Sequence, residues 1–315
     1  MVWFENMKAR RRRRAKRPPR AVIRGGFNVR ERKNALLLFS KVPEAGLVKT
    51  RLTTLKDGLF APEVASALYH CMLFDVVEII CAAMSELESR APRRDPETGE
   101  EVRDVYELVI STTPAENVAV MRKLFDDAGA WPRELVMIAD AGASFDEHYN
   151  HAFSQVWDRG ADCILSMGAD MPALTVNDVI AGFEALHRLD SVEGGGIVLA
   201  PDQEMGVSVI GWTRETDFDH AGVFYNQEGL TVLPAYIRKA RSLGLPAIYL
   251  PPIPDVDTMA DLRHTVTLVE ALNYCAGFDG NTPPWRTADA LDQMGWSEVR
   301  VMPNGLFDPR GHIDE

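Results

Sequence analysis

The sequence has few cysteines and no long apolar run. Its four cysteines lack the paired C-x-x-C spacing of metal and redox sites, and they are too sparse for a disulfide scaffold. The most apolar stretch, around residues 72–84, is interrupted by Asp75 and Glu78, whereas a membrane span needs about 20 predominantly apolar residues. We therefore expect a cytoplasmic protein with reduced cysteines and no membrane span.

Basic residues are scarce beyond the beginning of the chain. Residues 1–33 hold 13 of the 34 Lys and Arg residues and carry a net charge of +11, which leaves the rest of the chain at −23. Such an acidic body repels nucleic acid, so nucleic-acid binding is expected only through this basic arm. A run of like charges with no apolar segment behind it is typical of a disordered tail, and we predict disorder over residues 1–33.

The rest of the chain has the composition of a folded domain. Hydrophobic residues make up 46% and charged residues 25% of the sequence, which is ordinary for a globular protein. We place one domain at residues 34–274. Beyond Cys275 the composition shifts to Pro, Gly, Asn and Trp, which indicates a C-terminal extension at 275–315. It contains a possible helix at 287–294, a strand at 298–302 and a turn at Asn304-Gly305.

Short apolar runs alternate with amphipathic segments along the predicted domain. A continuous apolar run is typical of a strand that is buried on both faces, and apolar residues at intervals of four indicate a helix. Strands are predicted at 35–40, 105–110, 135–139, 163–167, 197–200, 207–212 and 247–250. Helices are predicted at 62–88, 114–128, 144–159, 176–189 and 230–243, with another from about Thr258, and residues 90–103 are predicted as a loop. This order predicts an α/β fold of the Rossmann-like type, with a mostly parallel sheet and helices on both faces.

The loop after the first predicted strand combines a glycine with cationic side chains. Gly46 suits a tight turn, and Lys49, Thr50 and Arg51 follow it directly. Backbone amides beside a glycine can bind an anion, Lys adds a point charge, and Arg can grip two phosphate oxygens. The loop has no Walker A pattern. It is therefore either a phosphate-binding loop or an exposed basic turn.

Carboxylates follow two later predicted strands. Asp170 comes just after the strand at 163–167, and Asp255 and Asp257 follow the strand at 247–250. Ligands bind at the carboxyl ends of strands in such sheets, and carboxylates there can hold Mg²⁺ or Mn²⁺ against phosphates. The alternatives are a turn-forming role for Asp170, and the start of a helix at Thr258, where Asp261 completes a near capping box.

The three segments together match a family in order. Residues 39–52 (FSKVPEAGLVKTRL), 168–174 (GADMPAL) and 255–262 (DVDTMADL) resemble a glycosyltransferase-A-like group of nucleotide-diphospho-sugar transferases. Some members of this group are arsenosugar-biosynthesis glycosyltransferases. The resemblance covers roughly residues 35–272 and implies a metal-assisted transferase that binds a nucleotide diphosphate.

The resemblance also implies roles for individual residues. Lys49 and Arg51, in the loop with Gly46 and Thr50, would hold the phosphates, and Asp170 and Asp257, with Asp255 as a lesser candidate, would bind a Mg²⁺ or Mn²⁺ ion. Residues 201–207 (PDQEMGV) align with a family stretch that usually reads P-x-x-D-G-G-Y. Here Glu204 and Met205 replace Asp and Gly, and Val207 replaces Tyr, so Glu204 is the candidate general base on the acceptor side.

Two histidines offer a different kind of site. His148 and His151 are three residues apart on a predicted helix and could form a metal pair, but no third ligand lies nearby in sequence, and zinc sites need one. His148 also occupies a position where many members of the group have Arg.

Three functions are consistent with these features. The preferred one is a glycosyltransferase that moves sugar from an NDP-sugar to a small acceptor. A nucleotidyltransferase, which joins an NTP to a phosphorylated substrate and releases pyrophosphate, is the alternative, because residues 49–52 (KTRL) are similar to the KSRL loop of phospholactate guanylyltransferases. The third is a non-catalytic nucleotide-binding protein, suggested by Met205 and the basic arm.

Overall fold

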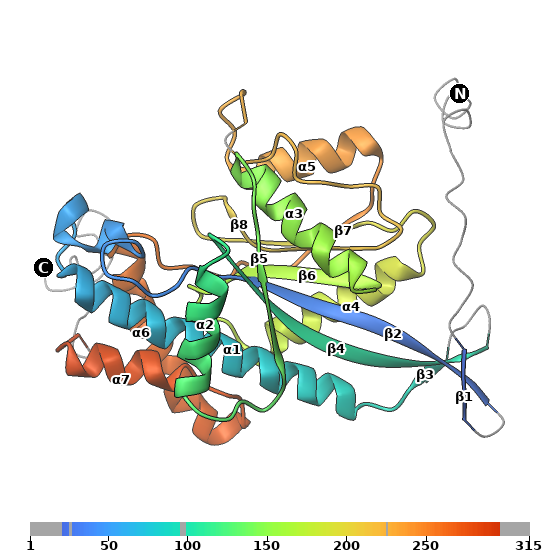
Figure 1. The fold of residues 1–315 in the computed structure, drawn as a ribbon, viewed down its shortest axis with the longest axis horizontal. Helices are drawn as coiled ribbons and strands as arrows, with labels where there is room; N and C mark the ends of the chain where they lie inside the picture. Colours follow the sequence, from blue (N-terminus) through green and yellow to red (C-terminus); the bar gives the residue numbers. More distant parts are fainter. Residues whose placement is uncertain (1–20, 25–26, 95–98, 225, 297–315) are drawn as a thin grey trace, which may run out of the picture. The chain divides into compact units, whose positions relative to one another are not determined.

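The computed structural model describes residues 21–24, 27–94, 99–224 and 226–296, in two units (Figure 1). The smaller unit lies within Met1–Arg32 and Ala91–Arg103. It contains β1 (Ala21–Arg24), the start of β2 (Phe27–Phe39), β3 (Arg93–Arg94) and the start of β4 (Glu101–Thr112). Within it, β1 pairs antiparallel with β2, and β3 pairs antiparallel with β4.

Two segments of this unit differ from the sequence-based expectation. Residues 21–24 and 27–33 are strand rather than disordered arm, and Val22 of β1 pairs with Val29 of β2. Valine favours extended backbone because its branched side chain fits a pleated surface. The predicted loop at 90–103 contains β3 and the first residues of β4. Residues 1–20 of the predicted arm lie outside the described residues.

The larger unit, Lys33–Arg90 and Asp104–Glu315, is built around one sheet. Its strand order is β5-β4-β2-β6-β8-β7-β9, and the strands not yet placed are β5 (Leu135–Ala139), β6 (Cys163–Gly168), β7 (Ile197–Pro201), β8 (Val207–Thr213) and β9 (Ala247–Tyr249). The pairs β2–β6, β4–β5 and β7–β9 are parallel, while β8 runs antiparallel to β6 and β7. The predicted mostly parallel α/β sheet is confirmed, with β8 as the reversed strand.

Alternate side chains of β2 belong to two different hydrophobic clusters. Leu36 and Leu38 pack in one cluster, and Ala35 and Leu37 pack in the other. Successive side chains of a strand point to opposite faces of a sheet. The continuous apolar run of β2 therefore reflects burial on both faces, as the sequence predicted.

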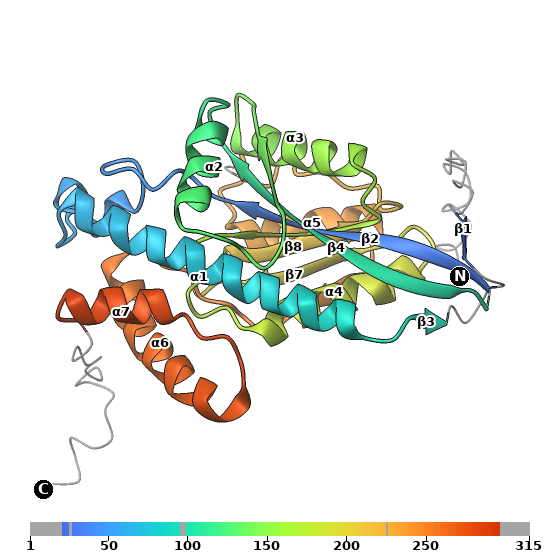
Figure 2. The same cartoon turned by 60° about the horizontal axis from the view of Figure 1, so that its bottom comes forward.

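Helices cover both faces of this sheet (Figure 1). The first cluster includes side chains of α1 (Pro62–Ser89), α2 (Asn117–Asp127) and α4 (Val176–Asp190), and the second includes those of α3 (Phe145–Asp158) and α5 (Val232–Leu243). A third cluster joins the start of α1 to α6 (Met259–Asp279) and α7 (Trp285–Gln293), and α6 and α7 lie beside one another below α1 in Figure 2.

Most predicted elements are present with nearly the predicted bounds. Strand β5 spans the predicted residues, and α1, α3, α4 and α5 begin and end within two residues of the predicted positions. Helix α6 begins after Thr258, whose side chain forms a capping box with Asp261. Helix α7 fits the short helix predicted in the C-terminal extension, whereas the strand at 298–302 and the turn at Asn304-Gly305 lie outside the described residues.

Helix α1 has the length and apolar composition of a membrane span, alone among the helices of the described ranges. However, 72% of its most apolar window is buried inside the protein. Asp75, in the middle of this helix, is fully buried and accepts hydrogen bonds from the backbone N–H groups of Arg286 and Thr287 at the start of α7. These contacts are those of a helix at the centre of a folded domain.

The second cluster contains a fully buried histidine. His220 lies among the rings of Tyr149, Phe153, Trp212 and Phe224, and its Nδ1 atom is 2.7 Å from the hydroxyl oxygen of Tyr236. Its Nε2 atom is buried without a hydrogen-bond partner. Burial in these apolar surroundings, with a smaller contribution from the charge of Lys239, lowers the pKa of His220 from 6.5 to about 3.

This burial predicts an acid-sensitive fold. Because the native protein excludes a charged imidazole, the unfolded chain binds the proton more strongly, and stability falls as the pH drops from 6.5 toward 3. Between pH 7 and pH 5, His220 should cost the wild type about 2 kcal/mol of unfolding free energy. Chemical denaturation at both pH values should show that His220→Asn, which keeps a polar atom near Tyr236, lacks this loss. Equal losses in the variant and the wild type would contradict the assignment.

Candidate functional site

The loop after β2 is fixed on either side of Lys49. Val48 packs in the first hydrophobic cluster and Leu52 in the third, and both are buried. Gly46 has a φ of 79°, in the left-handed region where glycine is favoured, as the sequence predicted for a tight turn. Lys49 also has left-handed backbone, with φ 46° and ψ 37°, and a short 3₁₀ helix at Thr50–Leu52 follows it. The loop thus holds the Lys49 side chain in one direction between two anchors.

The Lys49 ammonium contacts two of the predicted carboxylates. Its Nζ atom is 2.5 Å from Oδ2 of Asp170 and 3.1 Å from Oδ1 of Asp257. Arg51 reaches the other oxygen of Asp257, with Nη1 at 2.9 Å from Oδ2. The structure therefore brings together four of the residues predicted from three separate loops. Lys49 and Arg51, which were predicted to bind phosphate, also contact the predicted metal-binding carboxylates.

The two cations of the site differ sharply in burial. The side chain of Lys49 is 7% exposed, whereas that of Arg51 is 61% exposed. Burial alone would lower the pKa of Lys49, but the charges of Asp170 and Asp257 raise it above its ordinary value, so the ammonium stays charged. Lys49 is therefore a fixed internal cation, and Arg51 is the cation that faces solvent.

Tyr69 of α1 completes the surroundings of Lys49. The ammonium lies 5.9 Å from the centre of the Tyr69 ring, and the Tyr69 hydroxyl is 3.0 Å from Oγ of Ser40, directly after β2. Burial and the nearby charge of Asp170 raise the pKa of Tyr69 to about 12, so its hydroxyl remains protonated. No sequence pattern singled out Tyr69, because its contacts with Lys49 and Ser40 are made by tertiary packing.

A third predicted carboxylate lies beside this cluster. Burial and, after it, the charges of Asp170 and Asp257 together raise the pKa of Asp255 from 3.8 to about 7. The loop of Asp255 is joined to the loop of Asp170 by a hydrogen bond from the Val256 N–H to the Asp170 carbonyl oxygen, at 3.1 Å. Negative charge thus accumulates where the loops after β6 and β9 meet.

Gln203 forms hydrogen bonds to the loop that carries Asp255 and Asp257, here called the acidic loop, although the sequence analysis did not select it. Its Nε2 atom donates to Oδ1 of Asp255 and to Oδ1 of Asp261, both at 2.9 Å, and its Oε1 atom accepts from the Asp255 N–H at 3.1 Å. Asp261 in turn accepts from the N–H groups of Asp257 and Thr258 through its other oxygen. The predicted helix-capping role of this segment is therefore present together with the charged cluster.

Glu204 stands next to Gln203 but apart from the Lys49 cluster. It is exposed, in a turn where Asp202 accepts hydrogen bonds from the N–H groups of Glu204 and Gly206. Met205, which replaces the family glycine, has a φ of 64° and so occupies the backbone region that glycine favours. Within the described ranges, the Glu204 carboxylate has no hydrogen bond or ion pair to the clustered residues.

The two histidines of α3 do not share a ligand. Nδ1 of His148 is 2.6 Å from Oδ1 of Asp140, and Nδ1 of His151 accepts from the N–H of Ala141 at 2.9 Å. Asp140 is buried directly after β5 and also accepts from Ser111. Its place after a parallel strand is the signal that could have selected it. Across the described ranges, no group of three His, Cys, Asp or Glu residues is arranged to hold a metal ion.

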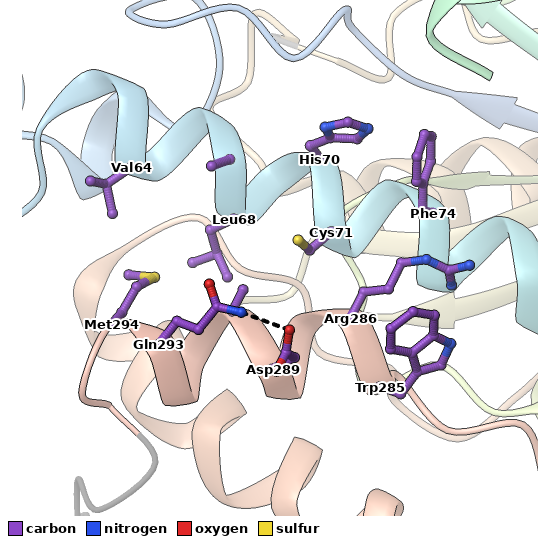
Figure 3. A pocket seen from close by; sticks show the side chains of 12 residues that line it. Val64, Leu68, His70, Cys71, Phe74, Trp285, Arg286, Asp289, Gln293 and Met294 are labelled. Atoms are coloured by element: carbon purple, nitrogen blue, oxygen red, sulfur yellow. Dashed lines mark hydrogen bonds between the residues drawn. The ribbon is translucent and has the colours of Figure 1, made fainter. Parts of the chain in front are cut away.

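A separate cavity of about 460 Å³ lies between α1 and α7 (Figure 3). Figure 3 shows Leu68 and Cys71 of α1 facing Asp289 and Gln293 of α7, with a 2.8 Å hydrogen bond between the last two side chains. None of the predicted site residues lines it. The cavity is therefore distinct from the charged cluster.

Comparison with solved structures places this arrangement in a known fold. A protein from Desulfovibrio desulfuricans G20, provisionally named a nucleotide-diphospho-sugar transferase, is similar to this chain with a TM-score of 0.60 and 20% identity. The match covers 85% of this chain and 99% of that one. The chain has the fold of a nucleotide-diphospho-sugar transferase. A family model described as an uncharacterized protein conserved in bacteria (DUF2064) also matches, at residues 101–227.

More distant structures resemble the chain less closely. A cytidylyltransferase from Leptospira borgpetersenii serovar Hardjo-bovis has 10% identity and a TM-score of 0.42, covering 87% of this chain and 99% of its own. Rv0371C from Mycobacterium tuberculosis H37Rv, in complex with manganese, has 16% identity and a TM-score of 0.34, covering 76% and 98%. None of the curated proteins compared with this chain matches it significantly. The fold expected from the resemblance to nucleotide-diphospho-sugar transferases is confirmed by the structural match.

Measurements of unfolding free energy can test the hydrogen bonds of Gln203. Gln203→Ala should lower the unfolding free energy by about 1 kcal/mol, because the buried Asp261 and the half-buried Asp255 lose a hydrogen-bond donor, although Gln203 itself is exposed. Gln203→Glu should cost more at pH 8, where a new carboxylate faces Asp255 and Asp261. This additional loss of unfolding free energy should be smaller at pH 5.5, because a protonated Glu side chain can donate a hydrogen bond to one of the two carboxylates. Denaturant unfolding at both pH values measures these differences.

A matched control is available on α7. The exposed side chain of Gln293 also donates to a carboxylate, that of Asp289, at 2.8 Å. Gln293→Glu should change stability by less than about 0.5 kcal/mol, because its one partner, Asp289, is exposed and water screens the two charges, whereas Gln203 contacts the buried Asp261. If Gln203→Glu behaved like Gln293→Glu at both pH values, position 203 would not face the acidic loop as described.

Proposed function

We propose that this protein is a metal-dependent glycosyltransferase that moves sugar from an NDP-sugar to a small acceptor. The observation that carries the proposal is the contact of Lys49 with Asp170 and Asp257, with Arg51 beside it. These residues come from the loops after three strands of a fold shared with a protein provisionally named a nucleotide-diphospho-sugar transferase. A cationic loop beside converging carboxylates is what a diphosphate and its metal ion require.

The donor atoms suit a hard divalent cation. Asp170 and Asp257 are partly exposed, at 27% and 44%, and present oxygen ligands of the kind that Mg²⁺ and Mn²⁺ prefer. Mg²⁺ is commonly held by one or two carboxylates together with substrate phosphates, rather than by a complete protein cage. The described residues form no group of three His, Cys, Asp or Glu side chains arranged to hold a metal ion, so the proposed ion would be held by two carboxylates and the substrate phosphates. Asp255 lies close enough for its pKa to respond to both acids, so it is the third candidate.

Each residue has a separate part in the proposed reaction. The exposed Arg51 binds diphosphate oxygens in bidentate fashion, while the buried Lys49 holds Asp170 and Asp257 in place and adds positive charge behind them. A bound divalent ion supplies further charge that stabilises the leaving nucleotide diphosphate. Gly46 and Thr50 shape the loop around these cations. Stabilising a leaving group in this way accelerates transfer, because the negative charge develops in the transition state.

The acceptor side is assigned to the turn before β8. Glu204 is an exposed carboxylate, and its neighbour Gln203 is bound to Asp255 at the edge of the charged cluster. A carboxylate there can take the proton of the acceptor hydroxyl as it attacks the anomeric carbon, so Glu204 remains the proposed general base. An acceptor bound between this turn and the Lys49 cluster would place its hydroxyl group near the Glu204 carboxylate.

Product analysis separates this reaction from its alternatives. With Mn²⁺ or Mg²⁺, the protein should release free NDP from one class of NDP-sugar, and no pyrophosphate from NTPs. Pyrophosphate release in the presence of a phosphorylated acceptor would establish the nucleotidyltransferase instead, as the similarity of residues 49–52 to the KSRL loop suggests. Metal-dependent nucleotide binding without turnover of any donor would establish a non-catalytic nucleotide-binding protein.

The metal role of Asp170 predicts a loss of binding without a loss of fold. Asp170→Asn should reduce Mn²⁺-dependent nucleotide affinity by more than about tenfold, measured by calorimetry, because one charged oxygen ligand is removed. The unfolding midpoint without nucleotide should fall only in part, because Lys49 loses the charge of Asp170 but keeps its contact with Asp257. Glu107→Gln, which removes a surface carboxylate paired with Arg159, is the matched control and should leave affinity unchanged. A large drop in the midpoint would instead make Asp170 a structural residue.

A further inference from the structure

The two proposed metal ligands share one internal cation. The Lys49 ammonium is 2.5 Å from Oδ2 of Asp170 and 3.1 Å from Oδ1 of Asp257, so it pairs with both carboxylates at once. Arg51 adds a second positive charge at the other oxygen of Asp257, at 2.9 Å. These carboxylates are the ligands that a divalent ion would use in the proposed function. An ion that binds there therefore meets positive charge at both of its protein ligands.

Lys49 differs from a surface lysine in how strongly its charge acts. Its side chain is 7% exposed, and the centre of the Tyr69 ring lies 5.9 Å from Nζ. Val48 and Leu52, on either side of it in sequence, are buried in separate hydrophobic clusters and fix the backbone. Water and salt screen a buried charge only weakly. The charge of Lys49 therefore acts on the two acids much more strongly than a mobile surface cation would.

The side chains that form these ion pairs cancel one another's charge. Asp170 and Asp257 carry two negative charges, and the two cations, Lys49 and Arg51, carry two positive charges. Asp255, beside them, brings the total to no more than one negative charge. The affinity of an oxygen site for a divalent cation depends on the charge of its ligands. With the two cations in place, these carboxylates alone form a weak site for Mg²⁺ or Mn²⁺.

We propose, building on the proposed function, that Lys49 makes metal binding conditional on the nucleotide. Its charge keeps Asp170 and Asp257 from binding Mg²⁺ or Mn²⁺ firmly by themselves. A nucleotide diphosphate completes the site, because its phosphates add negative charge and further oxygen ligands. The metal and the diphosphate then raise each other's affinity by the same factor, as thermodynamic linkage requires. Such a site takes up and releases the ion together with the nucleotide.

Lys49 acts on the two acids in opposite ways, and the sign of one measurement separates them. Lys49 holds the acids in place, and through this effect its loss would weaken metal binding. Its positive charge also opposes a second cation, and through this effect its loss would strengthen metal binding. We expect the second effect to dominate, because the ion would lie beside the same carboxylates that the ammonium contacts.

Calorimetric titration of the full chain with Mn²⁺ alone measures that sign. Lys49→Met, which keeps a long unbranched side chain without the charge, should bind Mn²⁺ at least about tenfold more tightly than the wild type. In the wild type, a nucleoside diphosphate should strengthen Mn²⁺ binding at least about tenfold, after correction for the complex that the two form in solution. Lys49→Met should reduce this coupling. UDP, GDP, CDP and ADP are compared first, and the one that the wild type binds most tightly with Mn²⁺ is used throughout.

Thermal unfolding keeps the test valid if the variant is less stable than the wild type. Lys49→Met leaves two carboxylates without their shared partner, so its unfolding midpoint should be lower. Mn²⁺ alone should then raise the midpoint of the variant more than that of the wild type, because a ligand stabilises the native state more the more tightly it binds.

Lys239→Met is the matched control. The Lys239 ammonium also pairs with a carboxylate, that of Asp219, and lies 5.3 Å from the centre of an aromatic ring, that of Phe218. Among the described residues, it forms no ion pair with Asp170 or Asp257. This variant should leave both the affinity for Mn²⁺ alone and the coupling to the nucleotide unchanged.

Failure of this role and failure of the proposed function give different results. Equal or weaker binding of Mn²⁺ alone by Lys49→Met, while nucleotide binding still requires Mn²⁺, would overturn the role of Lys49 and leave the proposed function intact. Wild-type binding of Mn²⁺ that is equally tight with and without the diphosphate would do the same. If neither protein bound Mn²⁺ under any of these conditions, the metal-dependent function and the role of Lys49 would both be wrong.

Discussion

One buried ammonium determines how the candidate site is assembled. Lys49 is almost entirely removed from water, and such a charge is tolerated in a protein only when carboxylates pair with it. Asp170 and Asp257 provide that pairing, and they belong to the loops after β6 and β9. The same ion pairs that satisfy Lys49 therefore fix three loops that are far apart in sequence. The hydrogen bond from Gln203 to Asp261 then fixes the acidic loop.

The position of Lys49 is maintained at a local cost. Left-handed backbone at a residue with a side chain costs about 1–2 kcal/mol, and such strain persists only where the surroundings enforce it. Val48 and Leu52 provide that constraint, because each is buried in a different hydrophobic cluster. The loop cannot relax without exposing one of these side chains. The hydrophobic core beneath the sheet thus sets the direction of a charged group at its edge.

The sequence predicted those features that depend on local pattern. The runs at 35–39 and 163–167 indicated strands buried on both faces, because only such strands omit the polar alternation, and the capping box of Thr258 and Asp261 marked the start of α6. It could not predict contacts made by tertiary packing. The ion pairs of Lys49 with two acids were not predicted, and Gln203 and Tyr69 were missed, because neither has a motif and both contact residues at least 20 positions away.

The balance of charge at the site limits what it can bind. Three carboxylates, Asp170, Asp255 and Asp257, face two cations, Lys49 and Arg51, and the pKa of Asp255 is raised to about 7 because burial and the other two acids disfavour a further negative charge. A nucleotide diphosphate would add at least two more charges of the same sign. Lys49 is enclosed by Asp170 and Asp257, and Arg51 is shared with Asp257, so in the proposed mechanism the diphosphate needs further positive charge. A divalent cation would supply that charge, so diphosphate binding requires the metal ion in the proposed mechanism.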